Sequence, residues 1–365
     1  MRTEMARGKS RHVMARRPTI KDIARRAGVS ESAVSFALND RPGVSQDTRA
    51  RIRRVAEELG WQPNSAARAL SGERSGAVGL VLARPAQTLG VESFFLQLVS
   101  GIQEVLAADR VALLFQVVDG IDAECAVYRR WWAERRVDGV LVVDARTQDP
   151  RPELLALLGL PAVIIGGTAS GGAGSAEGTG GEASSVWADD ARAMAQVVDH
   201  LHGLGHRRIT HIAGLPDLAH TARRIASLRA DAKARGLDPE HVRSVVTDYS
   251  DTEGAAATRR VLAEPEPPTA LVYDNDVMAV AGLAVAAELG IAVPGRISVV
   301  AWDDSALCRV PHPRLTALVR DTAGFGRLAA EELLAVLAGS PPRARESERP
   351  RLEPRESTAP PAAAY

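Results

Sequence analysis

Cysteine is scarce in this 365-residue sequence, and its two thiols, Cys125 and Cys308, stand in apolar surroundings. Two cysteines allow at most one disulfide and supply no metal-ligand spacing, so we expect reduced packing residues. No apolar run is long enough to cross a bilayer, and the basic N-terminus MRTEMARGKSRHVMARR lacks the apolar stretch of a secretory signal. These absences exclude disulfide scaffolds and membrane-spanning proteins, and they predict a cytoplasmic protein.

Motifs for catalysis are also missing from the sequence. The eight histidines are scattered, and none stands in a recognisable motif with a serine or an aspartate. The glycine-rich stretch 166–181 has no Gly-Lys-Ser/Thr signature, which argues against a nucleotide-binding loop. We therefore predict no catalytic residue, no metal and no cofactor, in a protein that is not an enzyme.

Charge is unevenly distributed, although the formal net charge is zero. Residues 1–74 hold 16 Lys and Arg against 8 Asp and Glu, a balance of +8, so the remainder carries −8. A basic head on an acidic body indicates that the head meets an anionic polymer; a solvated arginine-rich tail is the alternative. We divide the chain into a basic, disordered tail (1–17), a helical head (18–62), a hinge and linker (63–75) and a body (76–360).

The head sequence PTIKDIARRAGVSESAVSFALNDRPGVSQDTRARIRRVAEELGW predicts three short helices. Thr19, with Asp22 as a capping-box partner, can start the first helix, and Ser30 and Ser45 can start the others. Gly28 permits a tight turn between the first two. The residues expected to face the core are Ile20, Ile23, Ala24, Ala27, Val29, Val34, Ala37, Leu38, Ile52, Val55, Ala56 and Leu59. This arrangement is typical of a helix-turn-helix unit, whose second helix enters the major groove of DNA.

The outer face of that second helix carries small polar residues and one aromatic residue. Ser32 and Ser35 would let the backbone approach the base edges, and Glu31 could accept a hydrogen bond from cytosine N4. Phe36 could pack on a thymine methyl group; packing into the small core is the alternative. We expect Asn39 to end the helix in a left-handed conformation.

The segment from Pro18 to Gly72 resembles the DNA-binding headpiece and hinge of the LacI family of bacterial transcriptional regulators. The family pattern T-x-x-D-I-A-x-x-A-G-V-S-x-x-T-V-S-R-x-L-N is present, with Ala33 in place of Thr and Phe36 in place of Arg. The missing arginine would make the commonest specific contact, Arg to guanine, so we expect a different operator sequence. The head residues expected at the DNA are Thr19, Lys21, Ser30, Glu31, Ser32, Ser35 and Phe36, with Arg49 and Arg53 as further phosphate partners.

The hinge sequence GWQPNSAARALSGERSG contains at most two helical turns, Ser65 to Leu70, and so short a helix is marginal alone in water. The resemblance implies that two such helices, one from each subunit, fold in the minor groove. It also implies that Leu70 is pushed between base steps, with Ala67 and Arg68 near the groove. An ordinary flexible linker is the alternative.

The body alternates short apolar runs with helical stretches such as 94–107 and 190–204. The runs are AVGLVLA, VALLFQVV, DGVLVVD, PAVIIGG, RITHIAG, RSVVTDY, TALVYDN and RISVVAWDD. The alternation predicts an α/β body with doubly wound parallel sheets in two lobes, whose ligands bind beyond the carboxyl ends of the strands. Polar residues, mostly acids, stand at predicted strand ends: Asp144, 274–276 and 303–304. They indicate a polar cleft at that edge; the alternative is that each only caps the helix that follows.

The resemblance to the LacI family extends through the body, which is similar to type I periplasmic sugar-binding proteins. The matching stretches are LGHRRITHIAG, YDNDVMAVAGL, ELGIAVPGRISVVAWDD, PRLTAL and RLEPRESTAPP, the last of which implies a final strand. The resemblance implies that Asp276 and Arg224, or Arg223 in its place, bind the effector. A carboxylate accepting from hydroxyls and a guanidinium donating in a fixed fork suit a sugar or a nucleoside-like ligand. The other effector-binding residues that it implies are Phe94, Phe95, Asp189, Tyr249 and Trp302.

These features predict a homodimeric transcriptional regulator, expected to be a repressor, that binds a near-palindromic double-stranded operator at the nucleoid. A small molecule in the interlobe cleft, a sugar by resemblance, would modulate its affinity for DNA. A solute-binding protein of a transport system shares the body's architecture, but it should carry a secretion signal and no DNA-binding head. A sugar-metabolising enzyme is the third candidate.

Overall fold

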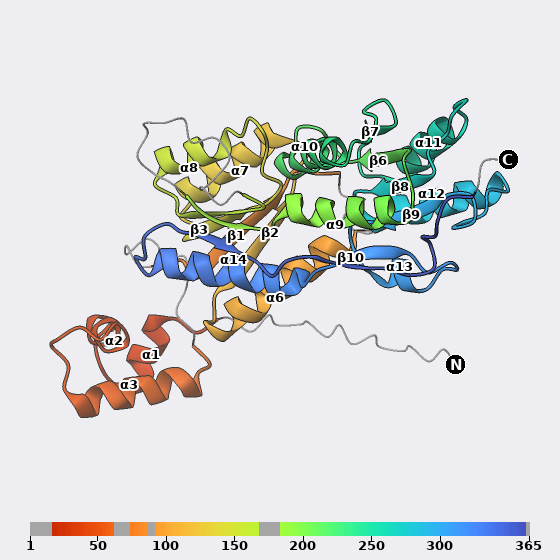
Figure 1. Cartoon of the computed structure of the whole chain (residues 1–365). Helices are drawn as coiled ribbons and strands as arrows, with labels where there is room; N and C mark the ends of the chain where they lie inside the picture. Colours follow the sequence, from red (N-terminus) through yellow and green to blue (C-terminus); the bar gives the residue numbers. More distant parts are fainter. Residues whose placement is uncertain (1–16, 62–73, 86–91, 168–182, 363–365) are drawn as a thin grey trace, which may run out of the picture. The chain divides into compact units, whose positions relative to one another are not determined.

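The computed structural model separates the chain into two compact units between Gly72 and Glu73, inside the predicted hinge and linker. The residues that it describes are 17–61, 74–85, 92–167 and 183–362 (Figure 1). Ala67, Arg68 and Leu70, expected at the minor groove, lie outside them. Within these ranges no helix is both long and apolar enough to cross a membrane.

The first unit holds three short helices, α1 (Ile20–Ala27), α2 (Glu31–Leu38) and α3 (Gln46–Glu58). They begin where the sequence predicts. The backbone N–H and the hydroxyl of Thr19 both donate to Asp22 Oδ2, at 2.9 and 2.7 Å. The hydroxyls of Ser30 and Ser45 accept backbone N–H groups three residues on, at 3.2 and 3.4 Å. Each cap satisfies donors that a helix start would otherwise leave free.

The core of this unit is small and lies where the three helices meet. Its buried members are Ile23, Ala24, Ala27, Val34, Ala37, Ile52, Val55 and Ala56. Two predictions are wrong here. Ile20 is 36% exposed, because it is the first residue of α1 and the residues that pack on the core come later in the helix. Asn39 has a φ of −102° and still donates to Ser35 O, so the left-handed residue is the next one, Asp40, with a φ of 52°.

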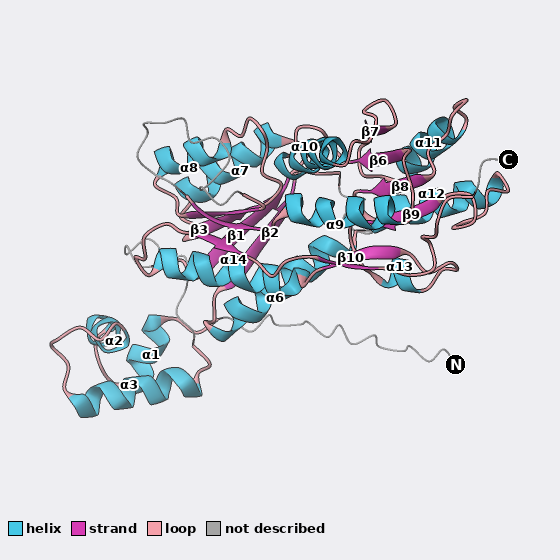
Figure 2. Cartoon of the chain, viewed as in Figure 1, coloured by secondary structure: helices cyan, strands magenta, loops and turns pink. Residues whose placement is uncertain are grey.

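The second unit is a two-lobed α/β body built on two six-stranded sheets (Figure 2). Lobe 1 has the strand order β11-β5-β4-β3-β1-β2, and lobe 2 has the order β12-β10-β9-β8-β6-β7. Only β12, which pairs with β10, is antiparallel in the described sheets. The lobe 1 strands are β1 (Ala77–Leu82), β2 (Ala112–Val117), β3 (Gly139–Val142), β4 (Ala162–Ile165), β5 (Ser184–Trp187) and β11 (Ala344–Glu346). Those of lobe 2 are β6 (Ile209–Ala213), β7 (Val242–Val246), β8 (Ala270–Tyr273), β9 (Ser298–Ala301), β10 (Thr316–Val319) and β12 (Arg351–Glu353).

Helices cover both faces of each sheet, as the alternating pattern predicts. Lobe 1 has α6 (Ser93–Ala108) and α14 (Thr322–Leu337) on one face, and α7 (Ile121–Ala133) and α8 (Arg151–Leu158) on the other. Lobe 2 has α9 (Asp190–Gly203) and α10 (Ala219–Ala234) on one face, and α11 (Asp251–Leu262) and α12 (Asp276–Glu288) on the other. The short α13 (Ala306–Arg309) follows β9.

The chain passes between the lobes three times within the described residues, from β5 to α9, from β10 to α14 and from β11 to β12. All eight predicted strands are confirmed, as is the last strand expected near the C-terminus. The parallel strands of each lobe end on the side where these crossings lie, so strand-end side chains from both lobes come together there.

Candidate functional site

The exposed face of α2 is the first candidate site. Glu31 and Ser32 are exposed and Ser35 is half-buried, while Val34 and Ala37 hold the opposite face in the core. The Ser30 and Ser32 hydroxyls lie 3.2 Å apart. Thr19 and Lys21 are also exposed, at the start of α1. A helix with short side chains on its open face fits closely into the major groove.

Phe36 lies on this open face and is 38% exposed. It is not a member of the buried core of the head, so the alternative that it packs there is wrong. A Cβ atom added to Gly43 would come within 3.4 Å of its ring, so the ring rests beside the turn that follows α2. The turn thus supports one side of the ring and leaves the other available.

Arg49 has a structural role at the end of α2 that the sequence did not indicate. Its guanidinium donates to the carbonyl oxygens of Ala37, at 3.2 Å, and Arg41, at 2.8 Å, and to Asp40 Oδ1, at 3.0 Å. Arg53 donates to the same Asp40 oxygen at 2.6 Å. Arg49 therefore caps the end of α2 from α3, and its contact with a DNA phosphate stays a prediction.

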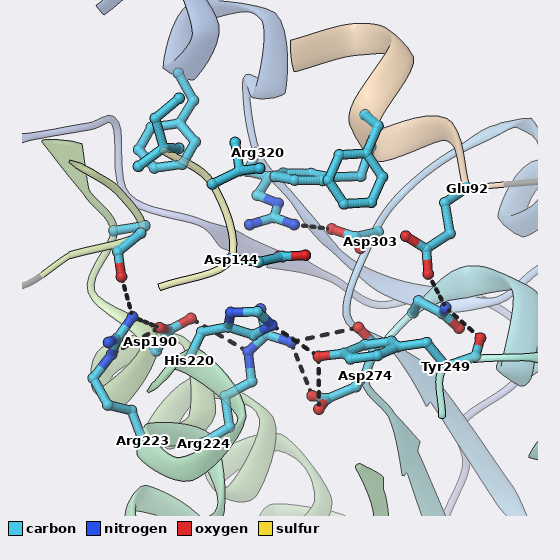
Figure 3. A pocket seen from close by; sticks show the side chains of 18 of the residues that line it. Glu92, Asp144, Asp190, His220, Arg223, Arg224, Tyr249, Asp274, Asp303 and Arg320 are labelled. Atoms are coloured by element: carbon cyan, nitrogen blue, oxygen red, sulfur yellow. Dashed lines mark hydrogen bonds and ion pairs between the residues drawn. The ribbon is translucent and has the colours of Figure 1, made fainter. Parts of the chain in front are cut away.

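The second candidate site is a cavity between the two lobes at the carboxyl ends of the strands (Figure 3). Its lining combines aromatic rings with paired charges. Predicted residues that line it are Phe94, Phe95, Tyr249, Arg224, Asp144, Asp274, Asp303 and the alternative Arg223. Other residues line the cavity without having been predicted: Arg84, Glu92, Asp190, His220, Arg320 and Phe325.

The lobe 2 wall of the cavity centres on Arg224. Its guanidinium contacts Asp274 Oδ1 at 2.9 Å and Asp190 Oδ1 at 3.3 Å, and lies 4.1 Å from the centre of the Trp302 ring. His211 shares Asp274 Oδ1 at 3.0 Å. Burial alone would raise the pKa of Asp274, but Arg224 and His211 hold it well below its usual range. This carboxylate therefore remains ionised near neutral pH.

The lobe 1 wall centres on Arg84, which is 5% exposed and follows strand β1. Its Nε donates to Asp144 Oδ2 at 2.6 Å, and its Nη1 lies 3.8 Å from Glu92. The guanidinium stands between the rings of Phe95, at 5.5 Å, and Tyr249, at 4.7 Å. Nη1 has no hydrogen-bond acceptor among the described residues, which leaves a donor at the cavity.

Glu92 joins the lobes and has an altered acidity. Its Oε1 accepts a hydrogen bond from Asn275 Nδ2 in lobe 2 at 3.2 Å. Burial raises the pKa of Glu92 to about 7, although Arg84 opposes the shift. Glu92 is thus a cavity carboxyl that titrates near neutral pH.

His220 and Tyr249 form a partly buried pair in the cavity, with 2.8 Å between His220 Nε2 and the Tyr249 hydroxyl. Burial, and then the charge of Arg224, lowers the pKa of His220 to about 4, so its ring is neutral near pH 7. Tyr249 has a φ of 74°, and Asp144 a φ of 52°, a left-handed backbone that side chains disfavour. Strain of this kind concentrates at functional sites.

Three predicted effector residues do not line the cavity. Trp302 lies behind Arg224. Asp189 caps α9 by accepting the Arg192 N–H at 2.9 Å, and the carboxylate that lines the cavity is that of its neighbour Asp190; effector binding by Asp189 stays a prediction. Asp276 opens α12 and is buried, and its Oδ2 has no hydrogen-bond partner among the described residues.

A metal site has no support in the described parts of the chain, where no group of three or more His, Cys, Asp or Glu side chains could hold an ion. The cavity lining itself offers hydrogen-bond donors and acceptors, charged groups and aromatic rings to a ligand. A ligand in the cavity would lie between the ion pairs of Arg224 on the lobe 2 wall and the carboxyl of Glu92 on the lobe 1 wall.

Known proteins share both parts of this architecture. Residues 19–64 match a family model described as bacterial regulatory proteins, lacI family, and residues 198–358 match a periplasmic binding protein-like domain. The HTH-type transcriptional regulator CelR of Thermobifida fusca is 31% identical over 89% of this chain and 93% of its own length. A solved transcriptional regulator CelR–cellobiose complex superposes with a TM-score of 0.70 at 29% identity, covering 93% of this chain and 100% of the other. The Lac repressor dimer bound to operator superposes with a TM-score of 0.79 over 94% of this chain and 100% of that one; at 24% identity this likeness shows the fold alone.

Proposed function

Because this chain belongs to the lacI family of bacterial regulatory proteins, we propose that it is a homodimeric repressor whose hold on operator DNA depends on a sugar in the interlobe cavity. The observation that carries the proposal is the pairing, in one chain, of an exposed helix-turn-helix face with a cavity of aromatic rings and paired charges. The relatives named above are transcriptional regulators. Its target places it in the cytoplasm, at the nucleoid.

The DNA-binding face is that of α2. Ser32 and Ser35 bring the helix backbone close to the base edges, Glu31 accepts from cytosine N4, and Phe36 packs on a thymine methyl group. Thr19, Lys21 and Ser30 contact phosphates beside the groove. One short helix binds weakly and with little selectivity, so two copies related by a twofold axis read a near-palindromic site. A bound dimer represses by covering a promoter.

The hinge residues remain a prediction, because Ala67, Arg68 and Leu70 lie outside the described residues. In the proposal, Leu70 enters the minor groove between two base steps and kinks the duplex. The bend lets more of the protein contact DNA.

The ligand is a sugar because the cavity offers what polyhydroxyl rings need. Phe94, Phe95 and Tyr249 supply apolar faces for the ring carbons, and Arg224 with Asp190 supplies donors and acceptors for hydroxyl groups. Asp276 adds an acceptor in the proposal, because its buried Oδ2 has no hydrogen-bond partner among the described residues. The related regulator CelR was solved with cellobiose, a neutral disaccharide.

Two measurements test the proposal in sequence. The full chain is first offered a random duplex library, and we expect it to select a near-palindromic sequence. Thermal unfolding is then recorded with cellobiose and a panel of other mono- and disaccharides, and with nucleosides as the contrasting class, because a ligand that binds the folded state raises the melting temperature. A stabilising sugar should change affinity for the selected duplex. Selection of no duplex would reject the DNA-binding part, and stabilisation by nucleosides alone would reject the sugar.

A further inference from the structure

The point where the chain enters the body from the linker is held by one carboxylate. Asp138, which immediately precedes β3, accepts the Ser75 N–H at Oδ1 (2.6 Å) and the Gly76 N–H at Oδ2 (2.8 Å). Its own N–H donates to Ala77 O at 2.8 Å. Hydrogen bonds to a charged acceptor are about twice as strong as neutral ones, and two in parallel fix direction as well as distance.

The C-terminal end of α14 completes this attachment. The Arg74 guanidinium donates to the carbonyl oxygen of Leu337, the last residue of α14. Gly139, next to Asp138, allows the helix to lie this close: an added Cβ would stand 3.1 Å from the Leu333 side chain and 3.3 Å from that of Leu337. The carboxylate and the helix end therefore form one continuous support for Arg74 and the two residues that follow it.

The other end of α14 lies at the cavity. Arg320, just before the helix, and Phe325 in its first turns both line the cavity, and the 16 residues of the helix span about 24 Å. Cβ atoms added to Gly101 on α6 or Gly326 on α14 would overlap backbone atoms of the facing helix. Backbone is thus packed on backbone between α6 and α14, close to the cavity end of α14.

We propose that Asp138 and the last turn of α14 form a linker anchor that fixes where the chain to the DNA-binding head leaves the body. The anchor thereby sets the distance between the two heads of a dimer, and it rests on the proposed function. Without it the linker gains length and freedom, and the heads sample a wider range of separations. Asp138 is a positioning residue: it acts on DNA binding through the linker and contacts no base.

The test is tolerance of operator spacing, measured with the full chain and the duplex that the wild type itself selects from random DNA. Affinities are measured for that duplex and for versions with one or two base pairs inserted at its centre. Each inserted base pair rotates one half-site relative to the other by about 35°. We expect the wild type to lose about tenfold or more in affinity per insertion, and Asp138→Ala to lose about threefold or less. Asp138→Asn keeps one carbonyl acceptor and should fall between them. Asp109→Asn, which removes an exposed carboxylate at the end of α6, should match the wild type.

An Asp138→Ala variant with the full spacing preference of the wild type would overturn the anchor while leaving the proposed function intact. If the wild type selects no duplex, the proposed function fails and the anchor fails with it. Thermal unfolding checks that each variant is folded. If Asp138→Ala does not fold, Arg74→Met removes the other half of the anchor and should also broaden the accepted spacing; a wild-type spacing profile for that variant would overturn the proposal equally.

Discussion

The two lobes share a strand order, yet they meet the cavity with walls of different character. On the lobe 2 wall, Arg224 is paired with Asp274 and Asp190, and the pKa values of both carboxyls are held below their usual range by Arg224 despite burial. On the lobe 1 wall, Arg84 faces Asp144 and Glu92, and burial raises the pKa of Glu92 to about 7. One wall therefore keeps its charges at neutral pH, whereas the other can exchange a proton. The difference shows that a common fold does not dictate the electrostatics at its strand ends.

The largest effect should follow from breaking the lobe 2 wall. Arg224→Met leaves the buried Asp274 carboxylate without its main partner and takes one of two guanidinium partners from Asp190, which costs about 3–5 kcal/mol in the free energy of unfolding. Chemical denaturation at pH 7 measures the loss. The matched control is Arg223→Met: that side chain is 27% exposed and its partner Asp190 keeps Arg224, so about 1 kcal/mol or less is expected. Equal losses in the two variants would contradict a special position for Arg224.

A smaller loss is expected from the same substitution on the lobe 1 wall. In Arg84→Met, Glu92 can take up a proton and become neutral, so only Asp144 remains as an uncompensated buried charge. We expect a loss of about 2 kcal/mol under the same denaturation conditions. A loss as large as that of Arg224→Met would show that the lobe 1 wall is no more adjustable than the lobe 2 wall.

The third test concerns proton exchange at Glu92. Its pKa rises from 4.5 in the unfolded chain to about 7 in the folded one, so the folded state binds the extra proton and loses stability as pH rises through 7. Glu92→Gln mimics the neutral form, and its stability relative to the wild type should increase by about 2 kcal/mol between pH 5.5 and 8.5. Parallel stability curves for the two proteins across that range would refute the shift.

The smallest effect on stability is expected at the head. Phe36→Ala removes a half-supported, exposed ring and should cost less than about 1 kcal/mol in unfolding free energy. Duplex selection should nevertheless return a changed base preference, with nonspecific binding and its salt dependence unaltered. The same consensus from wild type and variant would remove Phe36 from the residues that read DNA.

Much of the architecture could be predicted from the sequence, because apolar runs mark the strands and capping residues mark the helix starts. Eight strands lie where buried runs predict them, and Thr19, Ser30 and Ser45 begin the head helices through their own hydrogen bonds. The strands that were not predicted, β5, β10 and β11, are short, and β5 and β11 consist largely of polar residues. Their sheet positions come from tertiary pairing, which local patterns do not encode.

The cavity was predicted in outline and missed in detail. Acids at strand ends indicate the cavity, whereas an arginine at a strand end carries no such signal, so Arg84 is not among the predicted residues although it follows β1 as Asp144 follows β3. In the pair Asp189–Asp190, the first residue caps the helix and only the second reaches the cleft, a distinction that depends on the helix start. The capping contacts of Arg49 could not be predicted, because its carbonyl partners, Ala37 and Arg41, lie eight or more residues away in the sequence. Such contacts follow from the fold rather than from spacing in the sequence.

The three crossings between the lobes have a consequence for biosynthesis. Strands β11 (Ala344–Glu346) and β12 (Arg351–Glu353), which complete the two sheets, follow all the other described strands in the sequence. A ribosome must therefore synthesise both lobes before either sheet has its full set of these strands. A chain cut before residue 344 would lack an edge strand in each lobe, so neither sheet can be obtained complete by removing the segment that follows the other.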